Sequence, residues 1–184
     1  MSFLESNYEN AIMELLDELG YTRLYGPDID RDFHCPLYLD ALTKRLPQIN
    51  PEADRQAVEE ALYQLTHMEH GTLVQQNKQF TDWLQNGMEV SYQKNGETKH
   101  DIIRLVDYQT PGNNLFHAIN QWTIVENETK RPDVVIFLNG IPVVVVELKS
   151  CMREETDFSD GYRQIKNYMH EIPSLFQYLS LIHI

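Results

Sequence analysis

Two acidic residues and a lysine lie at the outer ends of a predicted β-hairpin. The hairpin starts after Asp133, consists of two apolar runs joined by an Asn-Gly pair, and ends in Glu147 and Lys149. An Asn-Gly pair between two apolar runs is a strong short-range signal for a hairpin, and a hairpin brings its outer ends together. We therefore expect Asp133, Glu147 and Lys149 to meet at one edge of a sheet. Such a set is the minimum for metal-dependent cleavage of a phosphodiester.

The donor groups at this edge predict a site for a hard divalent cation. Four valines before Glu147 indicate a central strand covered on both faces, where an unpaired carboxylate would be costly. Asp133, Glu147, the backbone carbonyl of Leu148 and water would form an all-oxygen shell, which suits Mg²⁺ or Mn²⁺. Such an ion polarises a phosphate and lowers the pKa of its bound water. Lys149 projects to the same side as Glu147 and would orient that water or offset developing charge.

The same pattern also has a purely structural interpretation. Acids that flank a hairpin are common, and a Glu-x-Lys sequence at a strand end usually forms an exposed ion pair. The short motif alone is therefore a weak signal for a nuclease.

Composition and charge limit the function further. The chain has 184 residues, 42% of them hydrophobic, which predicts one well-cored domain. No apolar run has the length of a membrane span, and two distant cysteines favour a reduced, cytoplasmic setting. The formal net charge of -13 is unlike that of a domain that binds DNA through its own surface. The chain is either unrelated to nucleic acids or a catalytic module that other domains deliver to DNA.

The periodicity predicts helices first, then strands, then a helix. Helices are expected at about 3–19, 37–46, 52–69, 73–85 and 159–171, and residues 21–36 are expected to form a loop. Strands are expected at 88–94, 99–107 and 115–126, in both arms of the 133–149 hairpin, and at 179–184. This order predicts an α/β (α+β) domain with a helical N-terminal region.

The segments around the hairpin resemble those of a known nuclease family. Arg131-Pro132-Asp133 together with Val146-Glu147-Leu148-Lys149 resembles the PD-(D/E)XK motif of the type I restriction enzyme R (motor) subunit. Further resemblance covers most of the chain in order, in Phe137 to Pro142, Tyr8 to Ile12, Leu19 to Tyr21, Gly26 to Asp28, Asn113-Asn114, Asn120 to Trp122, Tyr162 to Tyr168 and Glu171 to Phe176. The resemblance implies a restriction-endonuclease-like core, in which helices flank a central mixed β-sheet.

The resemblance also implies an activity and a set of roles. The family's N-terminal domain cuts double-stranded DNA with Mg²⁺; Asp133 and Glu147 would be the metal ligands and Lys149 the catalytic lysine. The family's Gln-x-x-x-Tyr motif would correspond to Gln164 and Tyr168, which would position DNA or the active site. Without the resemblance, a surface glutamine beside a packing tyrosine is the simpler interpretation.

The family's domain order implies partners beyond this chain. The whole subunit would continue into ATP-driven translocase domains and would join modification (M) and specificity (S) subunits. The phosphate-binding pattern GxxxxGK[ST] is absent here, so ATP would act only in those further domains. We expect one nuclease domain over 1–184, helical to about residue 87, with its core at about 88–184, ending before the translocase.

Other interpretations stay open at this stage. Glu9, on the first helix, could reach the metal as a glutamate does in some relatives, or could cap the helix with Ser6. The whole chain could instead be a non-catalytic docking module of the motor subunit. It could also be a stand-alone PD-(D/E)XK nuclease of repair or recombination.

Overall fold

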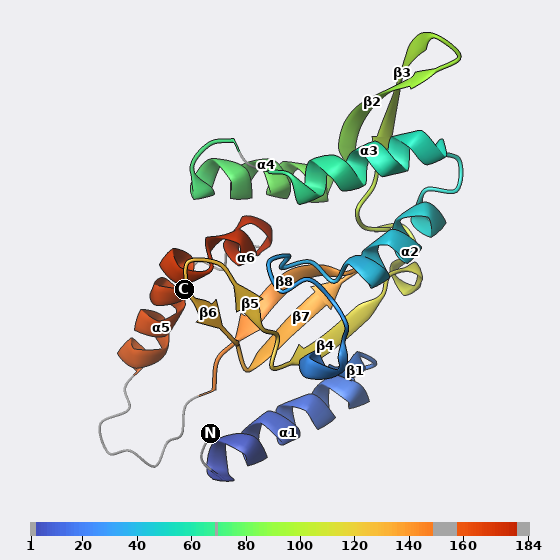
Figure 1. Cartoon of the computed structure of the whole chain (residues 1–184). Helices are drawn as coiled ribbons and strands as arrows, with labels where there is room; N and C mark the ends of the chain where they lie inside the picture. The colour runs from blue at the N-terminus through green and yellow to red at the C-terminus, as the bar shows by residue number, and fades with distance from the viewer. Residues whose placement is uncertain (1–2, 69, 149–157, 180–184) are drawn as a thin grey trace.

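The centre of the protein is a small mixed sheet. The computed structural model describes residues 3–68, 70–148 and 158–179. The sheet has four strands in the order β1 (Thr22–Tyr25), β4 (Phe116–Asn120), β7 (Val134–Leu138) and β8 (Ile141–Val146) (Figure 1). β1 and β4 run parallel, and the other neighbours pair antiparallel. The predicted α/β fold with a central mixed sheet and flanking helices is confirmed.

Helices cover the two faces of this sheet. On one face, Met13 of α1 (Phe3–Glu18) packs against Ala118 and Val134. On the other, Val135 packs with Tyr168 and with residues of α5 (Phe158–Glu171) and α6 (Pro173–Tyr178). Successive side chains of a strand point to opposite faces. The neighbours Val134 and Val135 therefore belong to different layers, one under α1 and one under α5.

A helical extension packs beside the sheet and carries its own core. It contains α2 (Leu39–Ile49), α3 (Arg55–Thr66), α4 (Leu73–Asn86) and the antiparallel hairpin β2 (Met88–Lys94) with β3 (Glu97–Ile103). Leu46, Leu65, Phe80 and Met88 are fully buried there. Figure 1 shows the β2–β3 hairpin projecting away from the main sheet. Among the described residues, no helix is long and apolar enough to span a membrane.

Short elements complete the fold. Two 3-10 turns, η1 (Gly26–Asp28) and η2 (Pro111–Asn113), precede α2 and β4 respectively. A two-stranded ribbon, β5 (Ile124–Val125) with β6 (Thr129–Lys130), connects β4 to β7.

Several predicted boundaries were wrong for identifiable reasons. The expected loop at 21–36 contains β1, whose pairing comes from the distant strand β4. The expected strand at 115–126 is divided at Gln121, which has a φ of 57° and ends β4. The helix expected from residue 52 begins at Arg55, because the side chain of Asp54 accepts a hydrogen bond from the N–H of Gln56 and caps it.

Within the described residues, the valine-rich strand does not have the central position that was predicted. The sequence indicated a central strand for the run before Glu147. Within the described part of the chain, β8 is the last strand of the sheet, next to β7. Its residues from Val143 to Val146 are only partly buried. The strand expected at 179–184 lies almost wholly outside the described residues.

The predicted Asn-Gly turn is a buried anchor of the hairpin. Asn139 and Gly140 have φ values of 53° and 85°, the left-handed pair that a type I′ turn requires. The fully buried Asn139 donates from Nδ2 to the carbonyl of Leu105 at 2.9 Å, and its Oδ1 accepts from the N–H of Leu115 at 2.8 Å. A Cβ on Gly140 would lie 2.5 Å from the carbonyl oxygen of Tyr38. The turn is therefore held by three separate segments.

A glycine-to-alanine pair tests this anchor. Gly96 lies in the same type of turn, with a φ of 83°, and a Cβ there would meet nothing within 4 Å. Gly96→Ala should cost about 1 kcal/mol of unfolding free energy, from the left-handed conformation alone. Gly140→Ala adds a clash with backbone and should cost about 3 kcal/mol or more. Denaturant unfolding of the two variants measures the difference, and equal losses would contradict the anchoring role.

Candidate active site

The two predicted acids come together at one end of the sheet. Asp133 directly precedes β7, Glu147 directly follows β8, and Val134 pairs with Val146. The next residues outward, Asp133 and Glu147, are thus opposite one another, and opposed residues of antiparallel strands point to the same face. Asp133 Oδ2 accepts a hydrogen bond of 2.7 Å from the backbone N–H of Leu148. The carboxylate of Asp133 is therefore fixed against the backbone just beyond Glu147.

Helix α5 supplies two hydrogen-bond donors to the carboxylate of Glu147. Gln164 Nε2 donates to Glu147 Oε1 at 2.7 Å, and the hydroxyl of Tyr168 donates to Oε2 at 3.1 Å. Gln164 Nε2 also lies 3.0 Å from the Tyr168 hydroxyl. Residues four apart share one face of a helix, so the pair reaches Glu147 together. The Gln-x-x-x-Tyr pair thus contacts the second predicted acid.

The environment of Tyr168 keeps its hydroxyl protonated. Burial raises the pKa of Tyr168 well above its ordinary value, and the negative charges of Glu147 and Asp133 raise it further. The hydroxyl is consequently a hydrogen-bond donor throughout the neutral and mildly basic range.

Glu9 reaches the same end of the sheet from α1. Its side chain is buried, with 7% of its surface exposed. Glu9 Oε1 accepts from Asn120 Nδ2 at 2.6 Å, and Oε2 accepts from Gln121 Nε2 at 2.7 Å. The pairing of these amides with Glu9 could not be predicted from the sequence, where the available signal is two adjacent amide residues at the end of an apolar run.

The described donors suit an oxygen-ligated cation. A carboxylate oxygen can accept more than one partner, so a carboxylate that is hydrogen-bonded to protein, as those of Asp133 and Glu147 are, can also be a metal ligand. Within 3–68, 70–148 and 158–179, no group of three or more His, Cys, Asp or Glu side chains is arranged to hold a metal. The predicted set is smaller, with two carboxylates and the Leu148 carbonyl. Lys149 lies outside the described residues, so its role stays a prediction.

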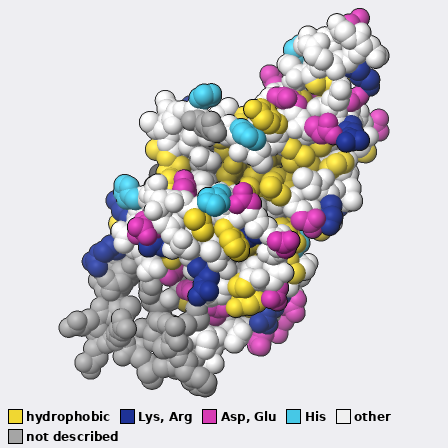
Figure 2. Space-filling view, in the orientation of Figure 1, with side chains coloured by type: hydrophobic (Ala, Val, Ile, Leu, Met, Phe, Trp, Pro, Cys, Tyr) yellow, Lys and Arg dark blue, Asp and Glu magenta, His cyan; other side chains and the backbone are white. Residues whose placement is uncertain are grey.

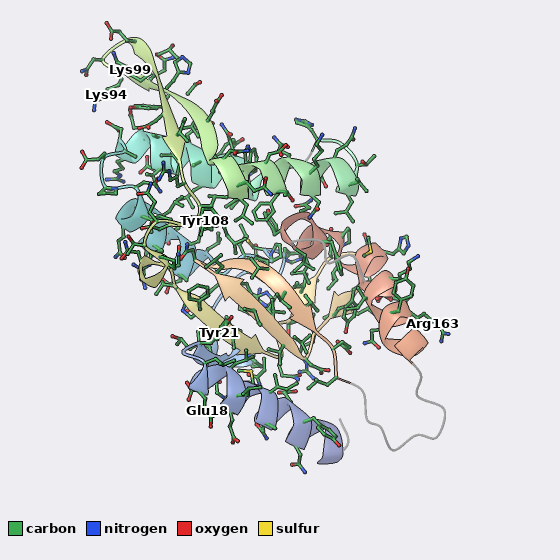
Figure 3. The ribbon with its side chains drawn as sticks, turned by 180° about the vertical axis from the view of Figure 1, so that it is seen from behind. Glu18, Tyr21, Lys94, Lys99, Tyr108 and Arg163 are labelled. Atoms are coloured by element: carbon green, nitrogen blue, oxygen red, sulfur yellow. The ribbon has the colours of Figure 1, made fainter. Side chains whose placement is uncertain are left out.

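The two helices beside the site, α1 and α5, come from opposite ends of the chain. Figure 3 shows α1 and α5 on either side of the sheet, with Arg163 on the outer side of α5. Arg163 directly precedes Gln164 and is exposed.

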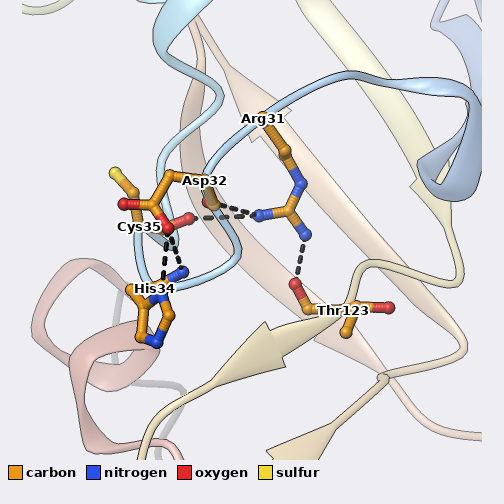
Figure 4. A network of polar contacts seen from close by, with 5 residues as sticks. All are labelled: Arg31, Asp32, His34, Cys35 and Thr123. Atoms are coloured by element: carbon orange, nitrogen blue, oxygen red, sulfur yellow. Dashed lines mark hydrogen bonds and ion pairs between the residues drawn. The ribbon is translucent and has the colours of Figure 1, made fainter.

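A half-buried arginine, Arg31, supports the segment that follows β4. The guanidinium carbon of Arg31 lies 3.4 Å from the ring centroid of Trp122, a close cation–π contact. Arg31 also donates to the carbonyls of Asp32 and Cys35 at 3.2 Å each, and to the carbonyl of Thr123 (Figure 4). Burial lowers the pKa of Arg31 to about 10, so the side chain stays charged at neutral pH. Arg31 thus connects the 31–35 loop to residues directly after Gln121.

Removal of this arginine should destabilise the fold measurably. Arg31→Ala loses the aromatic contact and leaves carbonyls without their donor, at a cost of about 3 kcal/mol in unfolding free energy. Arg55 is the control, because its side chain is exposed and pairs on the surface with Glu59 of the same helix. Arg55→Ala should change the unfolding free energy by less than about 0.5 kcal/mol. Similar losses in both variants, measured by denaturant unfolding, would contradict the supporting role of Arg31.

The family model and the relatives that match this chain all belong to type I restriction enzymes. The family model described as the type I restriction enzyme R protein N terminus matches residues 2–184. The type I restriction enzyme HindI endonuclease subunit of Haemophilus influenzae is 33% identical over 184 residues, which cover 95% of this chain and 17% of that protein. A provisionally named type I restriction enzyme MjaIXP endonuclease subunit of Methanocaldococcus jannaschii is 29% identical, over 95% of this chain and 18% of that protein.

The chain therefore spans less than a fifth of the length of these two relatives. The family match extends over nearly all of its residues and includes both acids, the Gln164–Tyr168 pair and the first helix. This chain belongs to the family of type I restriction enzyme R protein N termini.

Proposed function

We propose that this chain is the endonuclease domain of a type I restriction enzyme R subunit and hydrolyses phosphodiester bonds of double-stranded DNA with Mg²⁺. The observation that carries the proposal is the arrangement around Glu147. Its two carboxylate oxygens accept hydrogen bonds from Gln164 and Tyr168, and Asp133 is held beside it by the N–H of Leu148. Family membership and the names of the relatives support the same reading.

The proposed metal ligands are Asp133, Glu147 and the carbonyl of Leu148. Oxygen donors of this kind suit Mg²⁺ or Mn²⁺. A bound ion would polarise the scissile phosphate and lower the pKa of a coordinated water. Lys149 is proposed to offset the charge that develops on the phosphate.

The remaining residues are proposed to orient the ligands. Gln164 and Tyr168 each donate to one oxygen of Glu147, which fixes the plane of that carboxylate. Outer partners of this kind typically change metal affinity or activity when they are removed. Because burial keeps Tyr168 protonated, its hydrogen bond persists over the working pH range of a neutral enzyme.

Further domains and subunits are proposed to supply most of the DNA affinity. The chain has a formal net charge of -13, and phosphate contacts normally come from basic surfaces. On the face shown in Figure 2, basic side chains are scattered among acidic ones and form no broad basic patch. In the proposal, translocase domains bind ATP and move DNA, while the M and S subunits recognise it. Family membership supports this reading over a stand-alone repair nuclease; the docking alternative stays a prediction.

Alanine substitution of the site residues tests the chemistry. Asp133→Ala, Glu147→Ala and Lys149→Ala should each reduce DNA cleavage by the reconstituted complex by roughly a hundredfold or more. DNA-stimulated ATPase activity should persist, since it would reside in other domains. Glu89, an exposed acid of β2, is the control, and Glu89→Ala should cleave normally. Cleavage at the wild-type rate by the Asp133 and Glu147 variants would refute the proposed site.

A pair of tyrosine variants tests the orientation of Glu147. Tyr168→Phe removes one hydrogen bond to Glu147 and should slow cleavage by about 10- to 100-fold. Tyr162 lies on the same helix, is 48% exposed, and provides the matched variant Tyr162→Phe, which should have little effect. The cleavage rate at saturating Mg²⁺ and the Mg²⁺ concentration for half-maximal rate are the measurements. Equal behaviour of the two variants would show that the Tyr168 hydroxyl is dispensable.

A further inference from the structure

We infer that Glu9 is a positioning residue for Asp133 and acts through the side chains and backbone of Asn120 and Gln121. The inference rests on the proposed function, because it concerns the same site. In this inference, the buried carboxylate of Glu9 acts through its hydrogen bonds to Asn120 and Gln121, and not as a ligand of the metal.

A continuous set of hydrogen bonds connects Glu9 to Asp133. Glu9 binds the side-chain amides of Asn120 and Gln121 at 2.6 and 2.7 Å. The backbone N–H of Gln121 then donates to the backbone carbonyl of Asp133 at 3.0 Å. Asn120 pairs with Val134 in the β4–β7 ladder, so the Gln121–Asp133 bond extends that ladder by one residue. The orientation of Gln121 therefore determines where Asp133 enters the site.

Gln121 adopts a conformation that needs external support. Its φ of 57° lies in the left-handed region, which costs a residue with a side chain about 1 kcal/mol. Gly26 fits closely against the same backbone, since a Cβ there would lie 2.7 Å from the carbonyl oxygen of Gln121. Glu9 accepts a hydrogen bond from the side chain of Gln121, and Gly26 packs against the backbone carbonyl of Gln121. The two contacts together stabilise a bend that the local sequence does not favour.

Glu9 approaches from the face opposite to the one that Glu147 uses. Glu9 is one turn before Met13, which packs on Val134 under α1. Glu147 binds Tyr168, which packs with Val135 on the other face. This placement favours an indirect effect on Asp133 over coordination of the same ion.

The site around Glu9 depends on the match between a carboxylate acceptor and two amide donors, so a substitution that removes this match should disturb it. Hydrogen bonds to a charged acceptor are stronger than neutral ones, and an unpaired buried amide is costly. Glu9→Gln places an amide N–H₂ against another amide donor. In the double variant with Glu9→Gln and Asn120→Asp, the side chain at position 120 becomes an acceptor. The amide N–H₂ at position 9 can then donate to it, so the donor–acceptor match is restored and the negative charge lies at position 120.

The experiment uses the full-length subunit in its reconstituted complex and measures DNA cleavage, DNA-stimulated ATPase activity and thermal melting. Glu9→Ala should slow cleavage by about 10- to 100-fold while ATPase activity stays at the wild-type level. Glu9→Gln and Asn120→Asp should each slow cleavage, and the double variant should recover at least about tenfold over either one. Glu14, exposed on the same helix, provides the control Glu14→Ala, which should cleave normally.

The outcomes separate the competing explanations. A Glu9→Ala variant that cleaves normally overturns the inference. A double variant no faster than Glu9→Gln also overturns it, because a metal ligand at position 9 would need its carboxylate there. Loss of ATPase activity and melting temperature in parallel with cleavage would mean that Glu9 only stabilises the fold. Asp133→Ala serves as the reference: if it cleaves normally the proposed function fails, whereas if it is inactive and Glu9→Ala is normal only this inference fails.

Discussion

The pairing of Val134 with Val146 is the constraint on which the site depends. This register sets Asp133 opposite Glu147 and turns both side chains to the face covered by α5. A slip of one residue would move one acid to the face covered by α1. The buried Asn139–Gly140 turn opposes such a slip, because it is hydrogen-bonded to Asn114 directly after η2, to Leu115 directly before β4 and to Tyr38 directly before α2. The Asn139–Gly140 turn, at one end of the hairpin, thus helps to fix the relative positions of Asp133 and Glu147 at the other end.

Two helices from opposite ends of the chain then act on the acids from opposite faces. α5 contacts Glu147 directly through Gln164 and Tyr168. α1 contacts Asp133 indirectly, since Glu9 binds Asn120 and Gln121, and Gln121 binds the Asp133 carbonyl. Each acid has a separate support, so the separation of their carboxylates depends on how both helices pack on one sheet.

The sequence predicted the parts of this arrangement that are local. The hairpin, its Asn-Gly turn and the helix with Gln164 and Tyr168 follow from short apolar runs and turn residues. β1 was missed because a four-residue strand among acids and a Gly-Pro pair has no distinctive period, and its parallel partner is about a hundred residues away. The predicted inner position of β8 does not match its place as the outer strand within the described residues, because an all-valine run does not distinguish an inner strand from an outer one. The Glu9 amide contacts and the Arg31–Trp122 contact join segments far apart in the sequence, and no local pattern encodes such meetings.

We propose that Asp133 and Glu147 bind one divalent ion together. A crystal structure of the domain soaked in Mn²⁺, with anomalous scattering to locate the metal, would test this shared coordination. A shared ion should give a peak between the two carboxylates and the Leu148 carbonyl, with ligand distances of roughly 2.1 Å. Carboxylates that stay hydrogen-bonded only to protein at saturating Mn²⁺, with no peak between them, would contradict it.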